Sequence, residues 1–512
     1  MKRTIYPLLI AVYPVLALLA YNIAQVKPSA AFRSLAVSLL GAVLLWLVLR
    51  LVLKDWRKSG LIASVLWMLF FTYGHVYHFL KASPILGVTL VRHRLLIPLW
   101  LLVGALCVWW VIWKARDLAN ITYALNWIAI ILLVIPVGQI VWFNLHTALI
   151  SSKSSPTPEP GLHLSSQPSP PDIYYIILDA YVRQDVLEHR FDYDNEAFLR
   201  QLEEMGFYVA RCSQSNYAQT QLSMASSLNM TYLQDLGPEL NPDSKDMSPM
   251  WPLIKHSLVR QTLQDLGYTV VAFETGYYWL HLDDADVYYS PERSALNTGE
   301  ARLAVNGFEA MFIRESAGLV LTDVLSFLPR FMQPDLDAPH KEHRQRLLYT
   351  FEKLQGVPLA VKSPKFIYAH IVAPHFPLVF GSNGEDMSLP EPLDDATYKM
   401  AYPDEITYVN QRVLEIVHEI LTVTATPPVI ILQADHGDDH ALPSDRMAIL
   451  NAYYLPGLKD QLYPTITPVN SFRFVFDQYF GGDYNLLEDV SYYSAYQNPY
   501  QFETIPNNCT IH

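Results

Sequence analysis

The sequence predicts an α/β fold in which a doubly wound, mainly parallel sheet follows a bundle of five transmembrane helices. Two observations support this prediction. Long apolar segments fill the first 150 residues, and short apolar runs alternate with amphipathic stretches from Asp172 onward. Such alternation is typical of parallel strands flanked by helices.

Five segments of about twenty residues are apolar enough to cross a hydrocarbon core roughly 30 Å thick. They lie near residues 5–24, 34–53, 61–80, 95–113 and 123–145. The first could be a signal peptide, but its flank lacks a clear small-residue cleavage site and four further apolar segments follow it. We therefore expect it to be retained as an anchor.

The two parts of the chain carry opposite charge. Residues 1–150 contain thirteen lysines and arginines against two acidic residues, and the remainder contains 23 basic and 47 acidic residues. Binding a nucleic-acid backbone normally needs a basic face, so an acidic soluble part argues against nucleic acid as a partner. The acidic balance suits a site that captures cations.

The distribution of basic residues between the spans predicts the orientation in the membrane. With the N-terminus inside, eight basic residues face the cytoplasm and six face outward, and the bias is sharpest in the cluster at 50–58. Cytoplasmic loops carry an excess of lysine and arginine. We therefore expect a multi-pass protein of the plasma (inner) membrane whose C-terminal domain is extracytoplasmic.

A linker divides the chain into a transmembrane domain at 1–150 and a catalytic domain at 172–512. Residues 151–171 are rich in serine and proline and have no apolar period. Such a segment buries too little surface to fold, and it is typical of an extended spacer. In the domain that follows, we expect strands at 173–178, 269–273, 366–371 and 429–433, and helices at 194–205, 252–266 and 404–422.

Polar residues directly follow two of the expected strands. In IYYIILDAY, Asp179 comes directly after the apolar run. In PVIILQADHG, Asp435 and His436 come just after the apolar run. Ligands of open α/β sheets bind beyond the carboxyl ends of the strands. Two carboxylates and an imidazole at one edge predict a site for a divalent cation such as zinc or manganese. Taken singly, an aspartate after a strand is also a common turn former or helix cap.

Between these strands lies a polar segment, SNYAQTQLSMASSLNMTYL, in which Thr220 precedes three serines. Thr220 could simply be a helix N-cap. A hydroxyl at a helix N-terminus beside a cation is also what covalent catalysis requires, because the cation lowers the pKa of the hydroxyl and the helix end attracts phosphate.

Two other features leave alternatives open. His75 and His78 lie three residues apart on the third apolar segment, where they either reach the headgroup layer or line the entry of a lipid substrate. The three cysteines, Cys107, Cys212 and Cys509, show neither CxxC spacing nor a dense framework. A bridge between Cys212 and Cys509 is compatible with an extracytoplasmic domain, but the spacing does not establish it.

The order of motifs LDAY, T-x-x-S, APHFP and ADHG resembles that of the alkaline phosphatase and sulfatase superfamily. Within it, five spans followed by an outward-facing catalytic domain is similar to lipoteichoic acid synthases and phosphoethanolamine transferases. The resemblance implies a single cation held by Asp179, Thr220, Asp435 and His436, with Thr220 also the nucleophile. His375 in APHFP would face the substrate phosphate.

The chain departs from the family pattern at two places. Where the synthase branch contacts its substrate through Trp-x-Arg, this sequence has WLH, so Trp279 and His281 are the candidate substrate-binding residues. The C-x-P-x-R setting of the usual sulfatase nucleophile is missing, which argues against sulfate ester hydrolysis by the formylglycine route. His370 and His440 lie close to the motifs and leave a second metal site open, although the single-metal branch is the better match.

The predicted activity is transfer of a phospho-headgroup, of phosphoglycerol or phosphoethanolamine type, from a lipid donor to an envelope acceptor through a phospho-Thr220 intermediate. The substrate is then a lipid or an envelope glycan. Zinc or manganese is the expected cation, and magnesium is also compatible. Two alternatives remain: a sulfatase-like hydrolase or phosphodiesterase using the same site, and a non-catalytic envelope sensor or scaffold.

Overall fold

The computed structural model describes residues 3–24, 26–81, 93–151, 169–236, 240–291, 305–320, 337–389 and 393–509. The chain forms two compact units, one of Met1–His146 with Arg302–Lys341 and one of Thr147–Ala301 with Glu342–His512. We call the first the membrane unit and the second the α/β unit, and each is described by itself.

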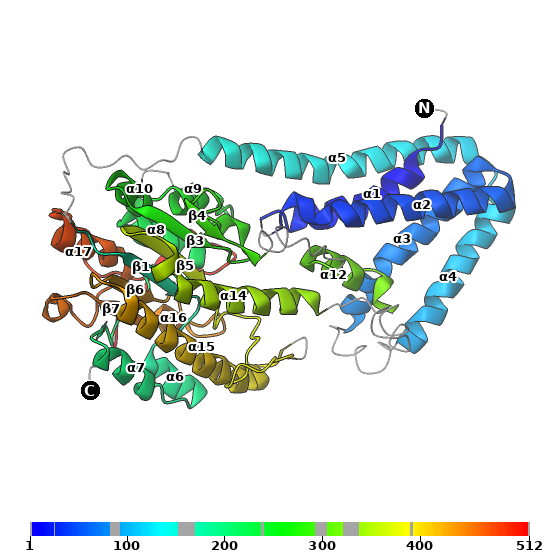
Figure 1. Cartoon of the computed structure of the whole chain (residues 1–512). Coiled ribbons are helices and arrows are strands. Elements are labelled where there is room, and N and C mark those ends of the chain that lie inside the picture. Colours follow the sequence, from blue (N-terminus) through cyan, green and yellow to red (C-terminus); the bar gives the residue numbers. More distant parts are fainter. Residues whose placement is uncertain are drawn as a thin grey trace. The chain divides into compact units, whose positions relative to one another are not determined.

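The membrane unit contains five long helices where the sequence predicts apolar spans (Figure 1). They are α1 (Tyr6–Tyr21), α2 (Phe32–Leu53), α3 (Trp56–Lys81), α4 (His93–Trp113) and α5 (Leu118–Ser151). Among the described residues, four of them, α2 to α5, are long and apolar enough to cross a bilayer. The α1 helix is shorter, at 16 residues, so a fifth span stays a prediction.

Polar contacts fix the ends of these helices. Asn126, buried on α5, accepts hydrogen bonds from the backbone N–H groups of Ile5 and Tyr6 at the start of α1. Asp55 accepts the N–H groups of Arg57 and Lys58 at the start of α3. Backbone donors in the first turn of a helix have no partner within the helix, so these side chains supply the missing acceptors.

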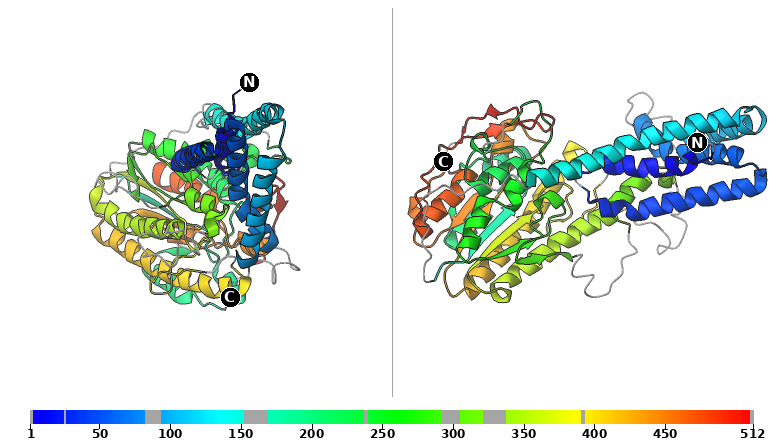
Figure 2. Two further views of the ribbon diagram at one scale, coloured as in Figure 1. Left: turned by 90° about the vertical axis from the view of Figure 1, so that its right-hand side faces the viewer. Right: turned by 90° about the horizontal axis from the view of Figure 1, so that it is seen from above.

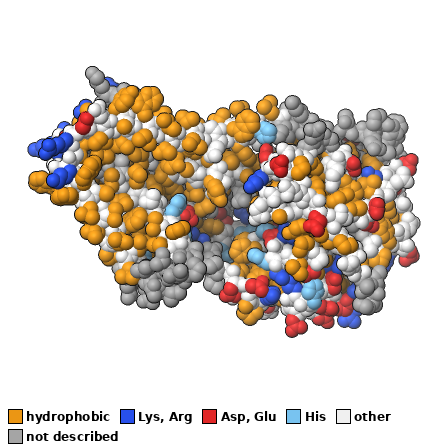
Figure 3. All heavy atoms as spheres, turned by 180° about the vertical axis from the view of Figure 1, so that it is seen from behind, with side chains coloured by type: hydrophobic (Ala, Val, Ile, Leu, Met, Phe, Trp, Pro, Cys, Tyr) orange, Lys and Arg blue, Asp and Glu red, His pale blue; other side chains and the backbone are white. Residues whose placement is uncertain are grey.

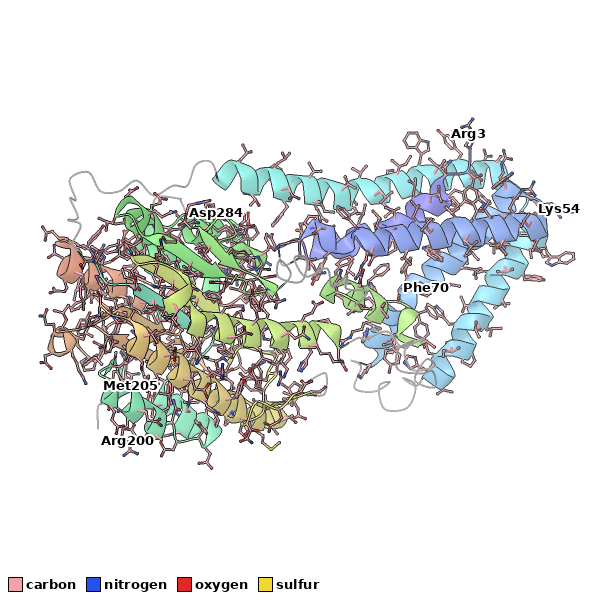
Figure 4. All side chains as sticks on the ribbon, viewed as in Figure 1. Arg3, Lys54, Phe70, Arg200, Met205 and Asp284 are labelled. Atoms are coloured by element: carbon pink, nitrogen blue, oxygen red, sulfur yellow. A yellow bond between two sulfur atoms is a disulfide. The ribbon has the colours of Figure 1, made fainter. Side chains whose placement is uncertain are left out.

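Basic residues gather at one end of the membrane unit. Arg3 before α1 and Lys54 after α2 lie at the same end of the helices (Figure 4). Lys54 and Arg57 line a surface hollow together with Arg116, which precedes α5. The space-filling view shows apolar side chains over most of the visible face of this unit and basic ones at one end (Figure 3).

A short helix far along the chain, α12 (Gly307–Arg314), also belongs to the membrane unit. A capping box between Asn306 and Glu309 starts it, and Phe308 packs with Val15 and Leu19 of α1. The sequence places this segment inside the domain at 172–512. Its amphipathic face buries apolar side chains against α1, which explains the different grouping. The linker at 152–168 lies outside the described residues.

The α/β unit is built on a seven-stranded sheet in the order β2–β7–β6–β1–β5–β3–β4. The strands are β1 (Ile173–Leu178), β2 (Tyr208–Val209), β3 (Thr269–Phe273), β4 (Val287–Tyr289), β5 (Lys365–Ile371), β6 (Val429–Gln433) and β7 (Asn451–Tyr454). Only β7 runs antiparallel to its neighbours in this sheet. The four predicted strands are confirmed as β1, β3, β5 and β6, and so is the mainly parallel α/β fold class.

Helices cover both faces of the sheet, as expected for a doubly wound fold (Figures 1 and 2). On one face, Tyr174, Ile176 and Leu178 of β1 enter a core shared with α6 (Gln184–Phe191), α7 (Glu196–Glu204), α14 (Ala338–Ala360) and α15 (Asp395–Val423). On the other, Tyr175 of β1 and Phe366 of β5 pack on Phe472 of α17 (Pro468–Phe480). That face also carries α8 (Thr220–Asn229), which contacts α17, α9 (Met250–Lys255) and α10 (Leu258–Asp265).

Smaller elements complete the described chain. These are the 3-10 turns η1 (Pro28–Ala31), η2 (Leu233–Asp235), η3 (Tyr278–Leu280) and η5 (Lys459–Gln461), the short helix α16 (Pro443–Met447), and the strand pair β8 (Tyr492–Tyr493) and β9 (Glu503–Thr504). A disulfide joins Cys212 to Cys509, whose Cα atoms lie 5.4 Å apart. The pairing that the sequence leaves open is therefore formed in this structure.

Candidate active site

The candidate site lies at the carboxyl end of the central strands. Asp179 follows β1 directly, and Asp435 and His436 follow β6, the neighbour of β1 in the sheet. Because paired parallel strands end at the same edge, these three side chains meet although about 250 residues separate them. Their ligand atoms all lie within 4.8 Å of one another, and all three side chains are buried.

Thr220 reaches this edge from the start of α8. Its Oγ1 lies 3.0 Å from Nε2 of His436. Hydrogen bonds to α16, which lies between β6 and β7, hold the loop before Thr220. The Arg446 guanidinium donates to the carbonyl of Ala218, and the N–H of Ser215 donates to the carbonyl of Met447. The N-cap is Gln219, whose side chain makes no capping bond, so Thr220 is the first helical residue and not the cap.

Among the described residues, two carboxylate oxygens of the cluster have no hydrogen-bond partner. Asp179 Oδ1 and Asp435 Oδ2 are buried and unpartnered, and each lies 3.6 Å from Nε2 of His436. A buried carboxylate oxygen without a donor carries a large desolvation cost. Two such oxygens facing one imidazole nitrogen and one hydroxyl form an O/N donor set that fits a divalent cation.

The remaining atoms of the cluster are held by the backbone. Asp435 Oδ1 accepts the N–H of Ala180, which has a φ of 63°. Nδ1 of His436 lies 2.7 Å from the carbonyl of Gly437, so a proton on Nδ1 leaves Nε2 free as a ligand. A Cβ at Gly437 would lie 2.7 Å from the carbonyl of Asp445, so the glycine is needed for this close approach.

His370 contacts Asp179 from β5. Its Nε2 is 3.2 Å from Asp179 Oδ2, while Asp179 Oδ1 remains unpartnered. Burial alone would raise the pKa of Asp179, but His375, His370 and His436 outweigh it and lower that pKa to about 2. His370 thus contacts Oδ2 of Asp179, and Oδ1 is left to face His436.

His375 lies at the margin of the cluster, and its ring centroid is 6.3 Å from that of His436. Its Nε2 is 3.2 Å from Asp439 Oδ2. Burial alone would lower the pKa of His375, but the carboxylates of Asp179 and Asp439 raise it to about 10. Asp439 also pairs with Arg446, and His375 and this arginine hold its pKa well below the usual range although burial opposes them.

The turn after β3 approaches the same margin. The ring of Tyr277 lies 6.4 Å from that of His375 and 5.5 Å from that of Trp279. Trp279 is buried, and so is His281, whose Nε2 accepts the backbone N–H of Gly276. The WLH motif predicts Trp279 and His281 as substrate-binding residues, whereas the residue of this turn with a ring contact to His375 is Tyr277.

The second half of the DHGDDH segment has a different role. Asp438 is buried, and its oxygens accept from Tyr398 Oη, His440 N–H and Arg190 Nε at 2.9, 2.9 and 2.7 Å. The His440 ring packs on Tyr398 at 4.9 Å between centroids. Within the described ranges, the grouping of possible ligands contains neither His370 nor His440.

No family model and no curated protein matches the chain. Several solved structures are similar to it. The zinc complex of the C-terminal periplasmic domain of EptC from Escherichia coli is 11% identical with a TM-score of 0.43, and the match covers 67% of this chain and 95% of that one. The integral membrane protein lipooligosaccharide phosphoethanolamine transferase A from Neisseria meningitidis is 10% identical with a TM-score of 0.38. The match covers 92% of this chain and 94% of that one.

The lipoteichoic acid synthase LtaP from Listeria monocytogenes is 13% identical with a TM-score of 0.38, and the match covers 68% of this chain and 82% of that one. Both kinds of transferase to which the sequence motifs are similar are therefore among these structures.

Proposed function

We propose that this chain is a membrane-anchored, metal-dependent transferase of the alkaline phosphatase and sulfatase superfamily. It moves a phospho-headgroup, of phosphoglycerol or phosphoethanolamine type, from a lipid donor to an envelope acceptor. The carrying observation is the Thr220 hydroxyl 3.0 Å from His436 Nε2, beside the buried Asp179 and Asp435 with their unpartnered oxygens. The order of the four sequence motifs supports the same assignment.

Asp179, Thr220, Asp435 and His436 would hold a single divalent cation. Zinc or manganese suits this mixture of carboxylate, hydroxyl and imidazole, and magnesium is also compatible. When bound, such a cation lowers the pKa of a hydroxyl and neutralises charge on phosphate oxygens.

In the first step, Thr220 Oγ attacks the phosphorus of the lipid phosphodiester. The Thr220 Oγ–P bond forms, the bond from phosphorus to the lipid oxygen breaks, and the proton that Thr220 loses is balanced by one taken up by the departing lipid hydroxyl. The N-terminus of α8 places backbone N–H groups next to Thr220, where they attract phosphate. His375 stabilises charge on the phosphoryl oxygens, and Trp279 and His281 shape the pocket for the headgroup.

In the second step, an acceptor hydroxyl attacks the phospho-Thr220 intermediate. The Oγ–P bond breaks, the acceptor loses its proton, and the Thr220 hydroxyl regains one. A sugar or lipid hydroxyl as acceptor makes the enzyme a transferase, and water makes it a phosphodiesterase. The membrane anchor favours transfer, since a tethered domain meets a donor confined to the bilayer more often than a free one does.

The α/β unit is proposed to lie outside the cytoplasm. The Cys212–Cys509 disulfide supports this, because disulfides persist in oxidising compartments. The basic cluster around Lys54, Arg57 and Arg116 supports a cytoplasmic position for that end of the helices. The chain would then be a multi-pass protein of the inner membrane, with α5 leading outward.

The test is incubation of the full-length protein with a fluorescent phosphatidylglycerol or phosphatidylethanolamine, with and without candidate glycan and lipid acceptors. We expect diacylglycerol release that rises with acceptor and a phospho-headgroup on the acceptor. Headgroup release at one rate regardless of acceptor would show a phosphodiesterase instead. No turnover with either lipid, in protein that contains no divalent cation, would favour the sensor or scaffold.

A further inference from the structure

The membrane unit contains a partly open cavity of about 710 Å³ that the proposed reaction does not use. Its walls come from α1, α3, α5 and α12, four elements of the same unit. Representative lining residues are Leu9, Ala17, Met68, Ile128, Leu132 and Phe312. The volume falls within the range of roughly 300–1,000 Å³ typical of ligand pockets.

The lining is apolar along most of its length and polar at one end. Leu9 of α1 and Leu132 of α5 mark the apolar part, and Asn22, His75 and Glu315 mark the polar part. His75 Nδ1 lies 2.8 Å from a carboxylate oxygen of Glu315 and 3.1 Å from its carbonyl. The cavity therefore has an amphipathic lining, with one donor and acceptor pair at its polar end.

The wall formed by α12 is fixed by a close backbone approach. A Cβ at Gly74 of α3 would lie 2.6 Å from the carbonyl oxygen of Arg314, so only glycine allows the end of α12 to sit this close. The N–H of Ala317 donates to the carbonyl of Phe70, which Figure 4 labels on α3. His78 Nε2 lies 3.4 Å from the Arg314 carbonyl. The two histidines of α3 thus contact the end of α12, and these contacts hold the α12 wall of the cavity in place.

Water does not suit the apolar part of this cavity. A buried water needs two to four polar partners. Of the hydroxyls in the lining, that of Thr72 donates to its own helix at Met68, and Tyr21 is exposed, which leaves Tyr13 among mainly apolar side chains. Two of the four walls, α3 and α5, are long and apolar enough to cross a membrane, and α1 is a shorter apolar helix. In the bilayer proposed above, the solvent around these helices would be hydrocarbon. The occupant whose chemistry matches both ends is an amphiphile from the bilayer.

We propose that this cavity binds a membrane lipid, with one hydrocarbon chain among α1, α3 and α5 and the polar headgroup at the His75–Glu315 end. Transfer of a hydrocarbon chain from water into an apolar site is favourable. In a bilayer that gain is largely absent, so the shape of the cavity and the polar pair set the preference for a bound lipid. Lipid binding here does not depend on the proposed reaction.

The test is photolabelling of the full-length protein in nanodiscs with a phospholipid that carries a diazirine in its acyl chain, followed by peptide mapping. We expect labels on cavity-lining positions of α1, α3 and α12, such as Ala17, Met68 and Met311. The labelling should be equal in a Thr220→Ala background, which separates this result from any failure of the transfer reaction.

Two substitutions sharpen the test. Ala17→Trp fills the cavity from α1 and should lower the interior labelling several-fold, whereas Ala36→Trp, at an exposed position of α2 outside the lining, should leave it unchanged. Interior labelling of Ala17→Trp at the wild-type level would overturn the proposal. In the wild type itself, labels confined to outward-facing residues such as Leu40 and Val134 would overturn it without any variant.

Discussion

Two buried aspartates, three residues apart, show how differently the same side chain is used in this molecule. Asp435 has one carboxylate oxygen without a partner, next to His436 and Thr220. Asp438 has both oxygens paired, with Tyr398, Arg190 and a backbone N–H. The first is left unsatisfied by the fold, and the second holds the loop that presents the first.

A third buried carboxylate shows that an unpartnered oxygen is not enough to define a site. Glu405 of α15 accepts the N–H groups of Val379 and Phe380 with one oxygen, and its other oxygen has no partner in the described part of the chain. Burial raises its pKa to about 8. The Asp435 cluster differs from Glu405 because a second carboxylate oxygen without a described partner, an imidazole nitrogen and a hydroxyl lie close to the first oxygen.

The largest expected effect is that of removing the hydroxyl. Thr220→Ala should lower transfer by at least about 10³-fold, because the covalent route loses its nucleophile. The change removes only a part-buried hydroxyl and a methyl at the first residue of α8, so the unfolding midpoint should change little. Thr220→Ser is the matched control and should retain part of the activity. Full turnover by Thr220→Ala would exclude the mechanism.

Asp435→Asn tests the unsatisfied member of the pair. It removes a charge from the proposed ligand set, so we expect divalent-cation affinity to fall by more than about 100-fold, since even residues that only support ligands change it by 10–100-fold. Cation content after dialysis measures this. The unfolding free energy without metal should stay equal or rise, because the oxygen that is replaced, Oδ2, is buried and accepts no hydrogen bond from the described residues. Unchanged cation content would contradict the assignment.

Asp438→Asn tests the satisfied member. The change removes the nearer of two carboxylates from the Arg190 guanidinium, Asp438 at 2.7 Å, and leaves Asp395 at 3.9 Å. Breaking a buried ion pair costs about 3–5 kcal/mol, which is an upper bound here because Arg190 is only partly buried. Chemical denaturation should therefore show a lower unfolding free energy. Metal affinity, measured on the folded fraction, should change much less than in Asp435→Asn. If both variants lost cation binding equally, the assignment of Asp435 to cation binding and of Asp438 to holding the loop would be wrong.

The smallest expected effect is the pH dependence from Glu405. Its pKa in the folded chain, about 8, lies above the ordinary value of 4.5. Between these values the unfolded chain has lost the proton and the folded chain keeps it, so stability falls as pH rises. Between pH 5 and pH 7, the stabilisation that protonated Glu405 gives the folded chain falls by about 2 kcal/mol. The difference in unfolding free energy between wild type and Glu405→Gln should show this slope, and a flat difference would refute it.

The sequence predicts the parts of this molecule that depend on apolar runs. Strands β1, β3, β5 and β6 are continuous buried runs, and they were identifiable for that reason. The edge strands β2 and β4 are short and only partly buried, so their residues carry no such signal. The expected helix at 252–266 is two helices, because Asn229 accepts the N–H of Leu258 and Ser257 caps α10. That break depends on a distant side chain.

The candidate site divides in the same way. Asp179, Asp435 and His436 are predictable because each directly follows a strand, and Thr220 because it opens a polar helix. Tyr277 and Asp439, which lie on loops, and Arg446, which lies in α16, are not predicted, since their roles depend on the direction in which each side chain points. Asp439 offered one signal, its place in the DHGDDH run, but nothing in that run distinguishes it from Asp438, whose partners are structural.

The most direct test of the central claim is mass spectrometry of the Thr220 peptide. The full-length protein, loaded with zinc or manganese, is incubated briefly with donor lipid without acceptor, quenched in acid and digested. We expect a phospho-headgroup adduct on Thr220 that disappears when acceptor is added and is absent in Asp435→Asn. Turnover of the lipid with no adduct on Thr220 at any quench time, or an adduct on another residue, would contradict the account.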